Sequence, residues 1–432
     1  MKQRFGVCCL MFLVVAFCAD AYAVSVTLVK GNSGPELRAL TFEGSGATVL
    51  TFGDEQVVIS EAPLSLEGSQ LLAEDVSPSE LFIVRDRRRM SERRGYDMLF
   101  AHSGFKLAIV KDPDHLATLE HVRLRPVTGN MVVIKEVKRA EVAAVPDPTV
   151  VKVLSKLSAT QYQQYMTTLT QGFLTRYSCS PSQLTVRDSI NNIFKQFGLT
   201  TNLGTFTNSC RSGCKSATGY NVIGIKKGLV RPQDYYLVGA HYDSISGSPC
   251  QSAPGANDNA SGMAGVMELA RVFSQLNTEA SLIFAAFGGE ELGMLGSKKY
   301  VQTLVNSGMK PNLKAFVILD MVSFYDKHRG VIIEGSNRTA QQSAALKRLA
   351  GYGSTYTGLT LETTTDYGDS DHEPFLNKGM AGALLMETDW SNYRYYHTIK
   401  DQMAYQDIPY GLEILKMTAA LLAQEAKVIS VP

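Results

Sequence analysis

Short apolar runs alternate with longer amphipathic stretches from about residue 150 to the C-terminus of the 432-residue chain. Each apolar run has the length of a buried strand, and each amphipathic stretch has the length of a helix that covers a sheet. Strands are expected at 221–225, 235–240, 282–287, 315–319, 331–334 and 383–386. Helices are expected at 150–177, 184–197, 260–275, 292–304, 339–351 and 410–426. This alternation predicts a three-layer α/β/α domain with a mostly parallel central sheet.

A different pattern precedes this domain. Residues 24–145 contain short apolar alternations, for example at 48–52 and 131–134, which predict a small β-rich domain. Pro146, Asp147 and Pro148 interrupt both helix and strand, so we place the domain boundary between residues 147 and 148. We expect 24–147 to be a pro-segment that restrains the following domain. The alternative is a permanent accessory domain that shapes the substrate entrance.

The β-rich part offers no recognisable site chemistry. His102, His115 and His121 have no carboxylates at ligand spacing, and ordinary surface or core histidines are expected. The arginine-rich run at 85–94 is expected to be a solvated loop, with proteolytic processing as the alternative.

The first 23 residues have the pattern of a signal peptide. Lys2 and Arg4 precede a short apolar run at 7–18, and Ala21-Tyr22-Ala23 forms a cleavage motif. The pattern predicts secretion, and an uncleaved anchor is the alternative. No later segment has the ~20 apolar residues that a membrane-spanning helix needs.

Four cysteines follow the predicted signal peptide: Cys179, Cys210, Cys214 and Cys250. In an exported chain they predict two disulfides, whose pairing the sequence leaves open. A zinc–cysteine site is the alternative, but the usual paired spacing is missing. The 42 basic and 41 acidic side chains nearly cancel, which disfavours nucleic acid or an anionic membrane as a partner.

Polar residues that can bind metal follow the expected strands. His241 and Asp243 come after 235–240 and, in extended chain, point the same way, so His241 can bind a metal while Asp243 orients its ring. Asp258 lies in a glycine-flanked turn before a helix, where capping that helix is the alternative role.

Two glutamates, Glu290 and Glu291, follow the strand at 282–287 on a glycine turn. Adjacent carboxylates repel unless one faces a cation or a proton, so one can bind metal while the other accepts a proton. A polar helix start is the alternative. Asp320 directly follows the strand at 315–319, and His397 lies in a late Tyr-His-Thr sequence.

From about Thr149 onward the chain resembles the double-zinc aminopeptidases of the bacterial leucyl type, within a peptidase family that also holds glutamate carboxypeptidases and glutaminyl cyclases. The resemblance rests on GAHYDS, PGANDNASG, GGEELG, LDM, SDH and YHT, in the order of the family. It implies two zinc ions per chain, one bound by His241 and Asp320, the other by Glu291 and His397, with Asp258 bridging them.

The resemblance also assigns three catalytic roles. It implies that Glu290 is the general base, that Asp243 supports His241, and that Tyr367 helps to hold the reacting carbonyl oxygen. At Asp369 the bacterial enzymes carry one half of a local disulfide that this chain lacks. The implied activity is hydrolysis of the N-terminal peptide bond of peptides with a free N-terminus, with a preference for apolar first residues.

Two other functions remain open. A glutaminyl cyclase of the same fold uses one zinc, but cyclases tend to interrupt the segment after the double glutamate and to place tryptophan before the final histidine. Here Glu291 runs directly into Leu292, and Tyr396 precedes His397. A non-catalytic binding relative would lose ligands, whereas every ligand position is filled. The preferred first residue, the physiological substrate and the oligomeric state are not predicted.

Overall fold

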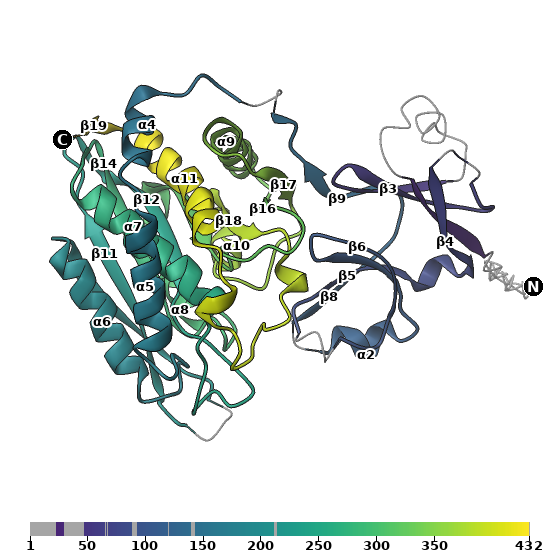
Figure 1. The fold of residues 1–432 in the computed structure, drawn as a ribbon, viewed down its shortest axis with the longest axis horizontal. Helices are drawn as coiled ribbons and strands as arrows, with labels where there is room; N and C mark the ends of the chain where they lie inside the picture. The colour runs from purple at the N-terminus through teal and green to yellow at the C-terminus, as the bar shows by residue number, and fades with distance from the viewer. Residues whose placement is uncertain are drawn as a thin grey trace, which may run out of the picture.

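The computed structural model describes residues 23–29, 47–64, 66, 68–88, 93–119, 121–139, 143–210 and 214–431. The predicted signal peptide therefore lies outside the described residues, apart from Ala23. In the described residues, no helix combines the length and apolarity needed to span a bilayer. Figure 1 shows a helix-rich C-terminal part beside a smaller N-terminal part made mainly of strands.

The C-terminal part is built on a mixed sheet whose four central strands are parallel. These four, in spatial order, are β14 (Ala280–Phe287), β12 (Arg231–His241), β15 (Leu313–Leu319) and β18 (Gly382–Glu387). On one side follow β11 (Thr218–Lys226) and β10 (Thr200–Thr207), and on the other β16 (Gly330–Glu334) and β17 (Thr360–Thr364). The pairs β10–β11, β11–β14 and β16–β18 are antiparallel. The expected α/β fold is confirmed, and its parallel part is the centre of the sheet.

Helices cover both faces of this sheet, because the central strands are apolar on both sides. In β12, Val238 and Ala240 belong to one buried cluster, whereas Leu237 between them belongs to the other. The first cluster includes residues of α4 (Pro148–Leu154), α5 (Ala159–Gln171), α6 (Gln183–Gln196), α7 (Gly262–Ser274), α9 (Ala340–Tyr356) and α11 (Ile408–Glu425). The second includes residues of α8 (Leu295–Asn306) and α10 (Glu373–Asn377). The layers are those of an α/β/α sandwich.

Some element boundaries differ from the expectation. The single helix expected at 150–177 is two helices, because Ser155 ends α4 and the Ser158 side chain caps α5 by accepting from the Gln161 amide. Pro148 begins a helix instead of only breaking one, since Asp147 caps α4 and a proline is tolerated in the first turn. Strands β10 and β17 were not predicted.

The N-terminal part contains two groups of strands. One is formed by β1 (Val24–Val29), β2 (Thr48–Phe52), β3 (Glu55–Ser60), β4 (Ser69–Val76) and β9 (Met131–Glu136). The other is a four-stranded sheet of β5 (Leu81–Asp86), β6 (Asp97–His102), β7 (Phe105–Ile109) and β8 (Val122–Pro126), beside the short helix α2 (Pro113–Ala117). Strand β9 pairs with β17, so the first group continues the sheet of the C-terminal part. Elsewhere, the short strands β13 (Asn277–Thr278) and β19 (Val428–Ser430) form a separate two-stranded antiparallel sheet.

The arginine-rich run is not the solvated loop that the sequence suggested. Arg85 lies inside β5, and the side chains of Arg85 and Arg87 are each only 3% exposed. Their guanidinium groups are buried because acidic side chains of the C-terminal part face them. Residues 89–92 of the run lie outside the described residues.

Two disulfides join the four cysteines, as expected. They pair Cys179 with Cys210 and Cys214 with Cys250. These pairs leave none of the four thiols for a zinc–cysteine site.

Candidate metal and catalytic site

The predicted ligands gather where the central parallel strands end. His241 is the last residue of β12, Asp320 directly follows β15, and Glu291 follows the glycine turn after β14. Because these strands are neighbours and run parallel, their carboxyl ends meet at one edge of the sheet. Fold topology thus brings together residues that lie up to 79 positions apart.

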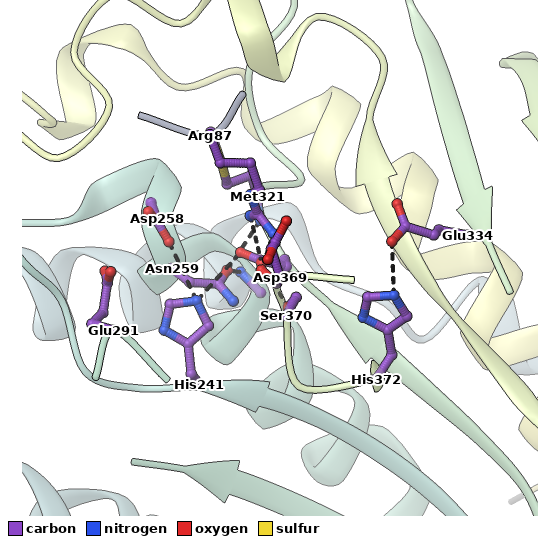
Figure 2. A network of polar contacts seen from close by, with 12 residues as sticks. Arg87, His241, Asp258, Asn259, Glu291, Met321, Glu334, Asp369, Ser370 and His372 are labelled. Carbon is purple, nitrogen blue, oxygen red and sulfur yellow. Dashed lines mark hydrogen bonds and ion pairs between the residues drawn. The ribbon is translucent and has the colours of Figure 1, made fainter. Parts of the chain in front are cut away.

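Asp258 lies between the two predicted ligand histidines. Its Oδ1 is 3.3 Å from Nε2 of His241, and its Oδ2 is 3.1 Å from Nε2 of His397. Nε2 of His241 is also 3.3 Å from Oδ1 of Asp320, and Nε2 of His397 is 3.1 Å from Oε2 of Glu291. Figure 2 shows His241 with Asp258 and Glu291 around it. The five predicted ligands therefore form one continuous cluster.

Asp243 and Glu290 flank this cluster. Nδ1 of His241 is 3.1 Å from the backbone oxygen of Asp243 and 3.7 Å from its carboxylate Oδ1, so the ring faces both groups. The same Oδ1 accepts a hydrogen bond from the backbone amide of Glu290 at 3.2 Å. Asp243 consequently links the strand that carries His241 to the turn that carries Glu290.

The cluster is buried and strongly acidic. The exposed fractions are 0% for His241, 4% for Asp258, 1% for Asp320 and 9% for Glu291. Burial raises the pKa of Glu291 to about 7, although His397 acts in the opposite direction. Burial alone would raise the pKa of Asp258, but its contacts with His241 and His397 lower it below the usual range. These carboxylates need positive charge beside them.

Burial acts on the pKa of a histidine in the direction opposite to its effect on a carboxyl group, because the charged form of histidine is a cation. Burial alone would lower the pKa of His397, but Glu291 and Asp258 raise it to about 9. For His241 the effect of burial is likewise outweighed by the surrounding carboxylates, which raise its pKa well above the ordinary value. A divalent cation would supply the positive charge that protons supply to this cluster in its absence.

The donor set fits zinc. Ligand atoms of His241, Asp258 and Glu291 all lie within 4.8 Å of one another, and Oε1 of Glu291 has no hydrogen-bond partner although it is buried. Imidazole nitrogens and carboxylate oxygens are the usual ligands of a catalytic zinc. These residues can therefore hold a metal ion.

Tyr367 stands apart from the cluster. Its hydroxyl donates to Oδ1 of Asn377 at 3.1 Å, and the guanidinium of Arg338 lies 5.1 Å from the centre of its ring. His372 of the Ser370-Asp371-His372 motif also contacts a residue outside the ligand set, since its Nε2 lies 2.9 Å from Oε1 of Glu334. The role that the resemblance implies for Tyr367 stays a prediction.

Two supporting residues escaped the sequence reasoning. The carboxylate of Asp401 accepts the backbone amides of Asn257 and Asp258, at 2.8 and 3.0 Å, and so holds the turn that carries Asp258. The fully buried Arg176 donates to the backbone oxygens of Tyr242 and Gly255, at 2.8 and 2.9 Å. Neither residue belongs to a motif, because each acts on backbone groups that are distant in sequence.

The N-terminal part also reaches the site. The His121 ring lies 6.4 Å from the ring of His397, and Nη2 of Arg87 lies 3.2 Å from Oδ2 of Asp320. The β-rich part therefore lies against the site, as either role expected for residues 24–147 requires.

Residues 221–421 match the family model described as Peptidase family M28. A probable zinc metalloprotease of Pyrenophora tritici-repentis is 29% identical over 46% of this chain and 54% of its own length. Aminopeptidase YwaD of Bacillus subtilis is 35% identical over 43% of this chain and 40% of its own length. The chain thus spans about half or less of these relatives.

Solved structures show the same fold at low sequence identity. The LapA aminopeptidase of Legionella pneumophila superposes with a TM-score of 0.57 at 18% identity, over 81% of this chain and 99% of LapA. A glutaminyl cyclase of Bacteroides thetaiotaomicron superposes with a TM-score of 0.51 at 18% identity, over 65% of this chain and 99% of the cyclase. These likenesses show the fold alone, and the segment at 221–421, which contains the five predicted ligands, matches the model of Peptidase family M28.

Proposed function

We propose that this chain is a zinc aminopeptidase that binds two zinc ions and removes single residues from the N-termini of peptides. The observation that carries the proposal is the position of Asp258, whose two carboxylate oxygens each face a different histidine. His241 and Asp320 would hold one zinc, and Glu291 and His397 the other. With Asp258 shared, each ion would have three protein ligands, and coordination positions would stay open for chemistry.

Bound zinc would polarise the scissile carbonyl and bring the pKa of a bound water towards ~7. Glu290 is suited to move the proton, because it directly precedes the ligand Glu291 and its side chain is partly exposed beside the cluster. Its carboxylate would accept a proton from the attacking water and deliver it to the leaving amine. Asp243 holds the Glu290 backbone in place through the amide hydrogen bond.

Selectivity for N-termini follows from charge. A free α-amine is a cation and is attracted to the carboxylates of the cluster, whereas a peptide bond inside a chain has no such charge. We further propose a preference for apolar first residues, by analogy with the leucyl aminopeptidases that the motifs resemble.

We also propose that the protein is exported through its N-terminal signal segment. The two disulfides support this, because such bonds persist mainly in oxidising compartments. N-terminal sequencing of protein recovered from the medium or the periplasm tests it, and a chain that keeps residues 1–23 contradicts it.

Aminoacyl chromogenic substrates with free and with acetylated N-termini test the activity, together with the zinc content of the purified protein. About two zinc ions per chain and hydrolysis of only the free-amine substrates are expected. One zinc with cyclisation of an N-terminal glutamine would favour the cyclase, and no zinc with no turnover would favour a binding role.

A further inference from the structure

Arg87 of the N-terminal part lies against the acidic cluster of the C-terminal part. Its Nη2 is 3.2 Å from Oδ2 of Asp320, and its Nη1 donates to the backbone oxygen of Asp369. The arginine precedes Asp320 by 233 residues, so this contact joins the two parts of the chain. Figure 2 shows Arg87 approaching the cluster from the side opposite the His241 backbone.

The contact leaves the metal-facing side of Asp320 free. Oδ1 faces His241 at 3.3 Å, whereas Oδ2 faces Arg87 and also accepts from the Ser370 hydroxyl at 2.8 Å. Zinc binding and the Arg87 contact are therefore compatible. What the guanidinium excludes is a second cation on the outer side of this carboxylate.

Arg87 is one of several arginines of the N-terminal part that meet acids or carbonyl groups around the site. Arg85 pairs with Glu334 at 2.5 Å, with both side chains buried, and Arg123 pairs with Asp369 at 3.0 Å. Arg123 also pairs with Glu373 at 2.8 Å.

Trp390 of the C-terminal part packs among these arginines. The guanidinium groups of Arg85, Arg87 and Arg93 lie 6.0, 5.6 and 6.0 Å from the centre of its ring. The backbone of Gly104 lies so close to this ring that a Cβ at that position would approach it to 2.3 Å. The surface between the two parts is thus complementary in both charge and shape.

We propose that the N-terminal part is an inhibitory cap and that Arg87 blocks the approach of the substrate's cationic α-amine. The proposal rests on the aminopeptidase function proposed above. A substrate amine that seeks the carboxylates of the cluster meets a guanidinium already placed there, with the remaining arginines holding it in position. The cap must move away, or be cut away, before a peptide can bind.

The segment that connects the two parts is accessible to a protease. Residues 143–146 are exposed, and Val145 is 91% exposed. On one side Arg139 is anchored to the backbone oxygens of Ser354 and Leu359, and on the other Asp147 caps α4. A cut between these anchors leaves the helix start intact and frees the cap from the chain.

Substitution of Arg87 tests the cap directly in the full-length, zinc-loaded protein. Arg87→Ala should raise kcat/KM on a free-amine aminoacyl substrate by about tenfold or more. This factor follows if molecules whose cap has moved away from the site are about a tenth or less of the wild-type population. Arg94→Ala is the matched control, because Arg94 is an exposed arginine of the same region, and its kcat/KM should stay within about twofold of wild type, as for most surface substitutions. Zinc content should be equal in all three proteins.

A second variant carries the recognition sequence of a specific protease in place of residues 143–146. Cutting this variant should raise kcat/KM by about the same factor as Arg87→Ala does. In a protein that carries both the cleavage sequence and Arg87→Ala, the cut should raise kcat/KM by a smaller factor. Binding of leucine hydroxamate, measured by calorimetry, provides a readout without turnover, and should be tighter for Arg87→Ala and for the cut protein than for the intact chain.

Equal activity and equal hydroxamate binding in intact, cut and Arg87→Ala proteins would overturn the cap while the aminopeptidase function stands. A loss of activity in Arg87→Ala with normal zinc would also overturn it, because Arg87 would then belong to the working site. Absence of turnover in every form would contradict the proposed function, and the hydroxamate measurement would still decide whether the cap exists.

Discussion

Glu290 and its neighbour Glu291 differ in what they contact. Glu291 faces His397 at 3.1 Å, whereas Glu290 is held through its backbone, whose amide donates to Asp243 and whose oxygen accepts from the amides of Gly293 and Met294. Glu290→Gln should therefore keep the zinc content near normal and lower kcat by about 10²–10⁴-fold, the usual contribution of a positioned acid–base group. Glu279→Gln, an acid at the far end of β14, is the control and should remain active. Near-normal turnover of zinc-loaded Glu290→Gln would remove Glu290 from the mechanism.

Asp258 should behave differently, because both of its oxygens face ligand histidines. Asp258→Ala would deprive both metal positions of a ligand, so zinc content and activity should fall together. Asp234→Ala removes an acid from the opposite end of the strand that carries His241 and should change neither. Zinc content is measured by atomic absorption after dialysis, and two retained zinc ions would show that Asp258 only supports its helix.

The turns on either side of the site depend on Arg176. This fully buried side chain donates to backbone oxygens of Leu169, Tyr242 and Gly255. Arg176→Ala would remove a donor from each of these carbonyls, at about 1–3 kcal/mol for each that is left without any partner and that water cannot reach. The urea midpoint should fall far more than in Arg348→Ala, whose partly exposed pair with Glu425 contributes about 1 kcal/mol or less. Equal midpoints for the two variants would contradict the structural role of Arg176.

The strands of the central sheet could be predicted because they are apolar on both faces. Val238 and Ala240 pack on one side and Leu237 on the other, and this produces a continuous apolar run in the sequence. Strand β10 lies at the edge of its sheet and is largely exposed, so it has no such run. The break after α4 was missed because serine caps interrupt a helix without removing its apolar periodicity.

The ligand cluster was accessible from sequence for a related reason. His241, Asp320 and Glu291 follow strands that could be recognised, so their meeting at one sheet edge follows from parallel topology. Arg87 and Asp401 could not be found in the same way. Asp401 lies in a loop and Arg87 directly follows β5, a strand of another sheet, so their contacts depend on how distant segments pack.

Glu334 joins the two parts of the molecule and makes stability depend on pH. Burial alone would raise its pKa, but Arg85 and His372 lower it well below the usual range. A depressed carboxyl pKa contributes stability above the unfolded value of about 4.3, and that contribution is lost as the pH falls towards the folded value. Wild-type stability should therefore decline below about pH 5.

Glu334→Gln removes the carboxyl group whose ionisation makes stability depend on pH. At pH 7 it also leaves the buried Arg85 without its charged partner. The free energy of unfolding at pH 7 should fall by about 3–5 kcal/mol, with a shallower decline in acid. Glu413→Gln, which breaks a partly exposed pair with Arg329, is the control and should cost about 1 kcal/mol or less. Urea unfolding at several pH values checks both, and parallel pH profiles for Glu334→Gln and wild type would contradict the account.

The most direct test of the whole account is a crystal structure of the zinc-loaded protein with anomalous data collected at the zinc absorption edge. The account predicts two anomalous peaks, one between His241 and Asp320 and the other between Glu291 and His397, with one oxygen of Asp258 beside each. A single peak, or peaks that lie away from Asp258, would contradict it.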